Sequence, residues 1–105
     1  MAGEDRAAEW YRRRGYTIVA RNWRCREGEL DLVVARADVV VFSEVKTRRS
    51  DRFGVPAEAV TPLKQRRVRG LARQFLREHP QRGRRVRFDV VGILGDEIYV
   101  LEAAF

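Results

Sequence analysis

Two runs of β-branched and apolar residues in the middle of the chain contain charged positions that a buried strand does not normally carry. The first run, Gly28–Val34, contains Asp31, and the second, Val41–Lys46, contains Glu44 and ends at Lys46. An unpaired charge inside a buried strand is costly in free energy. These side chains therefore need partners, and a bound metal ion would suit the two carboxylates.

The spacing of the two runs predicts a β-hairpin. They flank a polar break at 36–38, and a turn centred between Ala37 and Asp38 places Asp31 opposite Glu44 on one face of the sheet. Opposed residues have Cβ atoms about 5 Å apart, and like charges there repel unless a divalent cation lies between them. Lys46 follows Glu44 by two residues and shares its face. Ala37 is a poor residue for a tight turn with positive φ, and a three-residue loop would move Asp31 to the other face.

Two segments have the apolar spacing of amphipathic helices. Residues 4–14 are the first, and a glycine follows as a helix stop. Residues 61–79 are the second, and they begin with Thr61 as N-cap and a proline at the first helical position. Lys64 lies on the apolar stripe of this second helix, so it is expected to face the sheet. The two stripes consist of Glu4, Ala7, Ala8 and Tyr11, and of Lys64, Val68, Leu71, Ala72, Phe75 and Leu76.

Strands account for most of the remaining chain. Residues 39–45 are apolar almost without interruption, which is typical of a central strand covered on both faces. Residues 47–59 break the pattern and predict a polar, basic loop. The order helix, three strands, helix, two strands predicts a single α/β domain over residues 1–105, with a mixed central sheet flanked by helices. The other strands are predicted at 16–24, 86–94 and 97–101, the last two joined by a turn at Gly95-Asp96.

An Asp followed by Glu-x-Lys on the next strand resembles the core motif of the restriction-endonuclease-like, or PD-(D/E)xK, superfamily. A longer ordered set of residues, covering nearly the whole chain, resembles the YraN family of small bacterial proteins, which are predicted nucleases related to archaeal Holliday-junction resolvases. Leu30 and Ser43 depart from the residues usual at their positions, but neither is a proposed ligand. The matching segments are Gly3-Glu4, Gly15-Tyr16, Arg21-Asn22, Gly28–Leu32, Val41–Arg48, Lys64 and Arg87–Val91.

This resemblance implies a restriction-endonuclease-like fold and a metal-dependent nuclease. Asp31 and Glu44, with the backbone carbonyl of Val45, would hold one or two Mg²⁺ or Mn²⁺ ions, which polarise a phosphate oxygen and activate water. Lys46 would orient that water or neutralise charge that develops on the phosphate.

Two further residues are expected to complete the site. The resemblance implies that Glu4, on the N-terminal helix, joins the metal ligands; its other interpretation is an acid in the first helical turn, where it interacts favourably with the helix dipole. Lys64 would face the same site from the second helix.

The charge balance favours a polyanionic partner. Among 105 residues there are 22 Lys and Arg against 15 Asp and Glu, a net charge of +7. Lys46 and Lys64 are the only lysines. In a chain that otherwise uses arginine, they indicate positions where a compact ammonium is needed and a guanidinium does not fit.

Arginines are the candidate nucleic-acid contacts. In the predicted loop, Phe53 is available to stack on a base; a disordered connector is the alternative. On the second helix, the arginines either follow a phosphate backbone or form a solvated face. The proposed contacts are Arg48, Arg49, Arg52, Arg66 and Arg67, with Arg69, Arg73 and Arg77 on the same helical surface.

Other features narrow the class of protein. Cys25 is the sole cysteine, so an intrachain disulfide is impossible and a cysteine zinc site is implausible. His79 is expected to be a surface or capping residue, and Asp89 to form a structural ion pair with an arginine. The sequence has no apolar run long enough to span a bilayer and no signal-peptide pattern, so a cytoplasmic protein is expected.

These observations lead to the hypothesis of a Mg²⁺- or Mn²⁺-dependent endonuclease that hydrolyses DNA. Branched and single-stranded DNA are the candidate substrates, and the sequence does not choose between them. Symmetric cleavage of a junction would need two sites and therefore a homodimer. One alternative is a non-catalytic DNA- or RNA-binding module on a nuclease scaffold. An RNA- or ribosome-associated basic protein is another, and the sequence does not choose between DNA and RNA.

Overall fold

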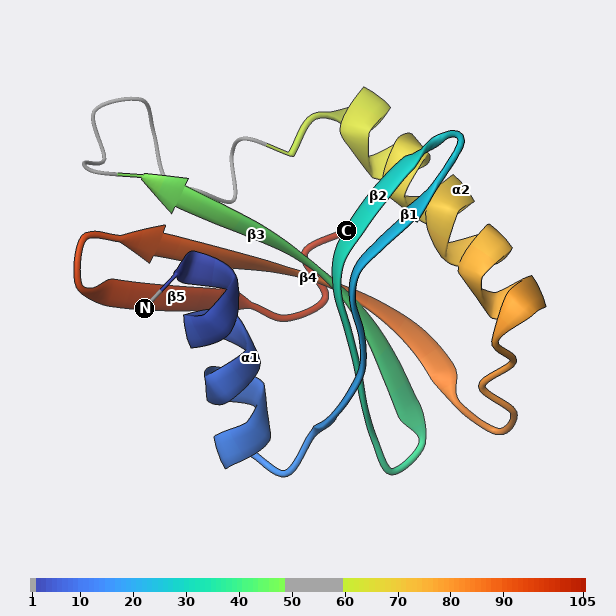
Figure 1. Cartoon of the computed structure of the whole chain (residues 1–105), viewed down its shortest axis with the longest axis horizontal. Helices are drawn as coiled ribbons and strands as arrows, with labels where there is room; N and C mark the ends of the chain where they lie inside the picture. Colours follow the sequence, from blue (N-terminus) through green and yellow to red (C-terminus); the bar gives the residue numbers. More distant parts are fainter. Residues whose placement is uncertain (1, 49–59) are drawn as a thin grey trace.

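A five-stranded mixed sheet with one helix on each face forms the protein (Figure 1). The computed structural model describes residues 2–48 and 60–105. The strands lie in the order β1-β2-β3-β4-β5; β3 and β4 are parallel and the other neighbours antiparallel. The elements are α1 (Gly3–Arg13), β1 (Thr17–Cys25), β2 (Gly28–Arg36), β3 (Val39–Arg48), α2 (Pro62–Glu78), β4 (Arg85–Leu94) and β5 (Glu97–Leu101).

The predicted α/β order and mixed sheet are confirmed, and the arrangement is consistent with a restriction-endonuclease-like fold. One boundary was wrong: Thr47 and Arg48 were expected in a loop but extend β3, because they pair with Ile93 and Leu94 of the parallel strand β4. The rest of the predicted loop, with Arg49, Arg52 and Phe53, lies outside the described residues.

The predicted hairpin has the register expected for a two-residue turn. Leu32 pairs with Ser43 and Arg36 with Val39. Ala37 adopts a left-handed conformation with φ 50°, despite its Cβ. Two bonds from β4 and the residue before it support the turn, since Arg84 Nε donates to the Ala37 carbonyl at 3.0 Å and Arg85 N to the Asp38 carbonyl at 2.7 Å.

The two helices cover opposite faces of the sheet and give the domain two apolar cores. Because side chains alternate along β3, Val41 packs on the α1 side, and Val40 and Phe42 pack on the α2 side. The helix stripes predicted from the sequence are the ones buried. They contribute Ala7, Ala8 and Tyr11 to the first core and Val68, Leu71, Ala72 and Phe75 to the second.

A buried polar network links the α1 side of the sheet to the end of the chain. Asp89 is fully buried, and Arg87 binds both of its oxygens at 2.9 Å, so the predicted structural ion pair is confirmed. Tyr11 Oη donates to Asp89 Oδ2 at 2.7 Å, and Ala103 N donates to Oδ1 at 3.0 Å. The buried carboxylate thus has both oxygens satisfied.

The β1–β2 hairpin separates from β3 near the middle of the sheet, as Figure 1 shows above its centre. Strand pairing between β2 and β3 extends from the turn only to Leu32 and Ser43. Beyond that pair, β2 stays with β1 and approaches α2, where a Cβ on Gly28 would lie 3.3 Å from Leu71 Cδ1. The result is a fork in the sheet, bounded by Asp31 on β2 and Val45 on β3.

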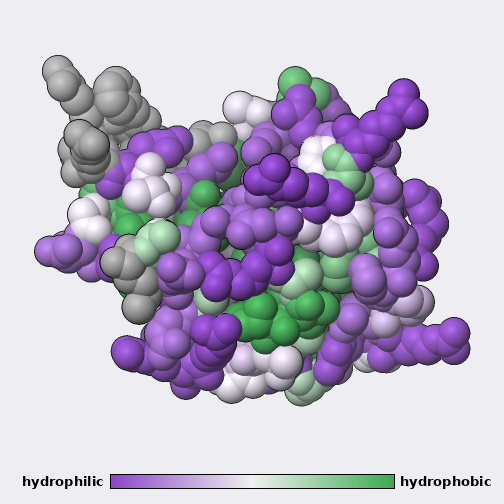
Figure 2. Space-filling model, in the orientation of Figure 1, coloured by the Kyte–Doolittle hydropathy of each residue, from purple (hydrophilic) through white to green (hydrophobic). Residues whose placement is uncertain are grey.

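Most of the face in Figure 2 is hydrophilic, with a hydrophobic area below the centre of the view. Among the described residues, neither helix is long and apolar enough to cross a membrane. His79 is exposed at the end of α2, as predicted, with its ring beside that of Phe75.

Candidate functional site

Asp31 occupies the fork between β2 and β3. Its Oδ2 accepts a hydrogen bond of 2.9 Å from Val45 N. The carboxylate thus replaces the backbone carbonyl of a neighbouring strand as the acceptor for this N–H. In an extended strand, the N–H and C=O of one residue point to the same side. The Val45 carbonyl, a predicted ligand, therefore points to the same side of β3 as the bond to Asp31.

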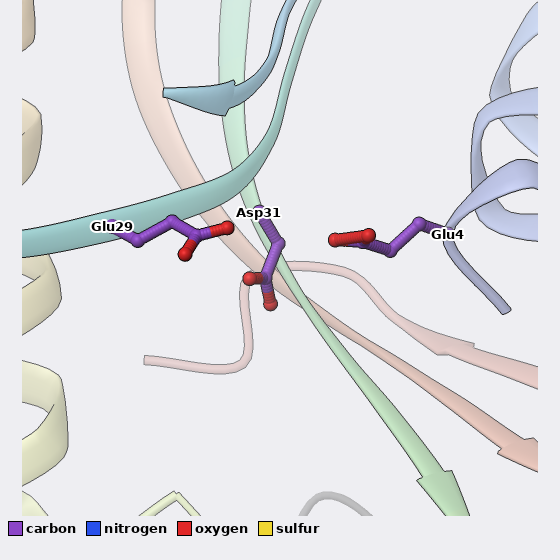
Figure 3. Close-up of side chains that lie close together, drawn as sticks. All are labelled: Glu4, Glu29 and Asp31. Atoms are coloured by element: carbon purple, nitrogen blue, oxygen red, sulfur yellow. The ribbon is translucent and has the colours of Figure 1, made fainter. Parts of the chain in front are cut away.

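Three carboxylates converge at the fork: Glu4, Glu29 and Asp31. Each offers an oxygen, and these oxygens all lie within 4.8 Å of one another. Figure 3 shows Asp31 between the other two, with Glu4 reaching in from α1 and Glu29 from β2. Glu4 can come so close because helix α1 begins at Gly3, where a Cβ would overlap the Thr47 hydroxyl. This is an oxygen-only set of the kind that hard divalent cations prefer.

The side-chain amide of Asn22 lies beside two of these carboxylates. With the amide oriented to satisfy its hydrogen bonds, Nδ2 donates to Glu4 Oε1 at 2.7 Å and to Glu29 Oε1 at 3.0 Å. Arg21, the preceding residue, pairs with Asp5 of α1 at 2.7 Å. Both β1 residues therefore hold the start of α1 against the sheet.

Mutual repulsion is visible in the electrostatics of this group. Partial burial, followed by the nearby charges of Asp31 and Glu29, raises the pKa of Glu4 above its usual value. Arg21 and the Asn22 amide act in the opposite direction. A divalent cation would relieve the repulsion that the carboxylates experience.

Glu44 lies on the α2 side of the fork and is 3 % exposed. Its Oε1 is 3.1 Å from Lys64 Nζ, which reaches it from the first turn of α2. Burial and the Asp31 charge raise the pKa of Glu44, while Lys64 and Lys46 lower it. The prediction that Lys64 faces the sheet is therefore confirmed, and Asp31, Glu44 and Lys64 line one pocket of about 440 Å³.

The expectation that Asp31 and Glu44 form a directly opposed pair was wrong. The hairpin register is the expected one, but the strands part after Leu32 and Ser43, so Asp31 binds Val45 N within the fork. Asp31 groups with the carboxylates of Glu4 and Glu29, whereas Glu44 pairs with Lys64.

Lys46 lies two residues after Glu44 on β3 and is half-buried. Its charge acts on Glu44, and it forms no ion pair with any of residues 2–48 or 60–105. An ammonium in this position can bind an anion that approaches Glu44.

The predicted nucleic-acid contacts lie in different places. Arg66 and Arg67 are exposed on α2, and Arg67 lines the same pocket as Asp31. Arg48 lies at the end of β3, where its Nη1 donates to the Thr47 carbonyl at 3.0 Å. Arg49 and Arg52 lie outside the described residues.

Two site residues were not assigned a role from the sequence, although both lie in matching segments. Glu29 precedes Asp31 by two positions, so regular strand alternation predicts both side chains on one face. Asn22 gives no such signal, because its contact with Glu4 depends on how α1 packs on the sheet.

Comparison with known proteins identifies many relatives. Residues 3–93 match the model of an uncharacterised protein family, UPF0102. A UPF0102 protein of Rhodococcus opacus is 55% identical over 92 residues, covering 88% of this chain and 78% of the relative. The corresponding values are 52%, 88% and 78% for a UPF0102 protein of Beutenbergia cavernae, and 53%, 88% and 72% for one of Nocardia farcinica.

Proposed function

The chain belongs to the uncharacterised family UPF0102, also known as YraN, and we propose that it is a metal-dependent endonuclease that hydrolyses DNA phosphodiester bonds. The observation that carries the proposal is the group of three carboxylates in the fork, whose oxygens lie within 4.8 Å of one another. Beside it, two lysines flank the buried Glu44. Phosphodiester hydrolysis needs carboxylates that bind a cation and nearby ammonium groups that bind a phosphate.

The residues fit Mg²⁺ or Mn²⁺. The donor set consists of oxygens, and repulsion between the carboxylates favours a cation among them. Glu4, Glu29 and Asp31 would hold it on one side of the fork, and Glu44 with the Val45 carbonyl on the other. When bound, such an ion polarises a non-bridging phosphate oxygen and lowers the pKa of the attacking water.

The two lysines have different tasks in this proposal. Lys46, which has no carboxylate partner among the described residues, neutralises charge on the phosphate or orients the attacking water. Lys64 lowers the pKa of Glu44 against the effect of burial and holds the carboxylate in place through the 3.1 Å ion pair. Lys64 lines the pocket with Asp31 and Glu44, and the charge of Lys46 acts on Glu44.

The exposed arginines and the net charge of +7 support DNA as the partner. Arg66 and Arg67 would bind phosphates along α2, where Arg67 lines the pocket. Arg48, the last residue of β3, and residues Arg49 and Arg52 are further proposed contacts. We further propose that the substrate is branched or single-stranded DNA and that the protein acts in the cytoplasm. At junctions it would act as a homodimer.

The test is cleavage of labelled duplex, single-stranded, flap and four-way-junction DNA with Mg²⁺ or Mn²⁺. We expect cleavage of at least one substrate, its loss with chelator, and a rate at least about a hundredfold lower in Lys46→Ala. Arg12→Ala, which removes an exposed charge in the last turn of α1 away from the proposed contacts, is the control. Tight binding that is insensitive to chelator, with no cleavage of any substrate, would replace the proposal by a non-catalytic DNA- or RNA-binding module.

A further inference from the structure

Asn22 occupies an unusual place in the middle of a strand. It lies within β1 but has φ 51°, in the left-handed region. Residues on both sides of it pair regularly with β2, Arg21 with Leu32 and Trp23 with Leu30, yet Asn22 and Asp31 are not a pair in the ladder. The regular pairing of the sheet is therefore interrupted at the position opposite Asp31.

The interruption resets the alternation of side chains on both strands. On β1, Arg21 and Asn22 are consecutive, yet both reach acids on α1, namely Asp5 and Glu4. On β2, Leu32 packs in the α1-side core, while both Leu30 and Val33 pack in the α2-side core. Without a reset, Leu30 and Leu32 would share a face. The reset leaves Asp31 in the plane of the fork, where it binds Val45 N.

The side chain of Asn22 complements its backbone. Its amide nitrogen lies 2.7 Å from Glu4 Oε1 and 3.0 Å from Glu29 Oε1, so one neutral donor joins two acids from different elements. Glycine would adopt the same φ but has no donor. Aspartate tolerates this φ but would add a fourth negative charge. Asparagine is the residue type that meets both requirements.

From this geometry we propose that Asn22 is the positioning residue of the carboxylate site, and that it acts through Glu4, Glu29 and Asp31 rather than on substrate. Its backbone turns Asp31 into the fork, and its amide holds the other two acids beside it. The inference rests on the proposed function in that these acids are taken to bind a divalent cation, but its structural part does not depend on cleavage.

The test compares two variants that retain the backbone conformation, Asn22→Gly and Asn22→Asp, by Mn²⁺ titration and thermal unfolding. Asn22→Gly should melt within about 4 °C of the parent in chelator but bind Mn²⁺ about tenfold more weakly, because the groups that orient metal ligands are lost. Asn22→Asp should melt lower in chelator and recover more of its melting temperature with Mn²⁺ than the parent gains. Parental Mn²⁺ affinity in Asn22→Gly would overturn the proposal.

A measurement without metal separates this proposal from the proposed function. In the metal-free protein, the Asn22 side-chain NH₂ signal in a ¹⁵N NMR spectrum should move when Glu4→Gln removes its charged acceptor. It should not move in Glu78→Gln, which removes an exposed charge on α2. An unmoved signal in Glu4→Gln would overturn the positioning role, whereas absence of Mn²⁺ binding by the parent, with the signal shift intact, would count against the metal-dependent function alone.

Discussion

Glu44 is a carboxylate held where the folded protein disfavours its charge. Burial and Asp31 raise its pKa, and the two nearby lysines offset this only in part. Among residues 2–48 and 60–105, Lys64 is the ion-pair partner of Glu44, at 3.1 Å. Such a group is retained at a cost in stability, which is common where a site serves chemistry rather than folding.

This arrangement predicts how stability depends on pH. Because the pKa of Glu44 is higher in the folded state than the usual 4.5, the folded state binds the extra proton between the two values. The contribution of Glu44 to stability is therefore largest below about pH 4.5 and decreases as the pH rises through the folded pKa. Glu44→Gln has no such loss. The free energy of unfolding of the variant minus that of the parent, both measured in chelator, should therefore be larger at pH 8 than at pH 4.

Urea unfolding at both pH values measures the difference. Glu78→Gln, which removes a charge from an exposed position on α2, serves as the control and should change little relative to the parent between the two values. If Glu44→Gln and the parent lost stability equally between pH 4 and pH 8, the environment described for Glu44 would be incorrect.

Helix α1 brings Glu4 to the fork because its first residue is a glycine. Gly3 leaves no room for a Cβ, which would overlap Thr47 Oγ1 and lie 3.3 Å from Ile93 Cδ1. A side chain there would require Thr47 or the start of α1 to move, and a shift of α1 would displace Glu4.

Gly3→Ala is therefore expected to weaken Mn²⁺ binding, even though alanine is the better helix former. Thr47→Ala removes the overlapping hydroxyl, so the double variant Gly3→Ala/Thr47→Ala should regain most of the parental affinity. Calorimetric titration of the three variants measures both effects. No loss in Gly3→Ala, or no recovery in the double variant, would show that this contact does not position Glu4.

The strands illustrate what could be predicted from the sequence and what could not. The register of the β2–β3 hairpin followed from apolar alternation and a short polar break. Ala37 adopts the left-handed conformation in the turn because Arg84 binds the Ala37 carbonyl and Arg85 N binds the Asp38 carbonyl. The orientation of Lys64 toward the sheet followed from the apolar stripe of the second helix. These are local patterns, and local patterns determine one element at a time.

The fork was not predictable by the same means. It depends on where β2 leaves β3, and that point coincides with the left-handed Asn22 and with contacts from α1. These arise from three separate segments of the chain. The sequence alone therefore predicts Asp31 opposite Glu44, and Glu29 has a signal only in its spacing of two residues from Asp31.

The molecule as a whole depends on a buried network around Asp89, which is not one of the proposed ligands. Asp89 joins Arg87, Tyr11 and the segment near Ala103, and so ties β4, α1 and the end of the chain together. Removing one partner of a buried ion pair leaves the other without compensation.

Asp89→Asn should therefore lower the free energy of unfolding by about 3–5 kcal/mol. Below its unfolding temperature it should bind Mn²⁺ like the parent, because Asp89 is not among the carboxylates of the fork. Chemical denaturation and Mn²⁺ titration of the same sample test both statements. A destabilisation below about 1 kcal/mol, or a marked loss of affinity in the folded variant, would contradict this separation of stability from function.

The most direct test of the central claim is the Mg²⁺- or Mn²⁺-dependent cleavage rate of labelled four-way-junction and flap DNA, compared for the parent, Asp31→Asn and Asp89→Asn at a temperature where all three are folded. The account predicts cleavage by the parent and by Asp89→Asn, and a rate for Asp31→Asn no higher than the parent shows with chelator. Equal rates for Asp31→Asn and the parent would contradict the assignment of the fork as a nuclease site.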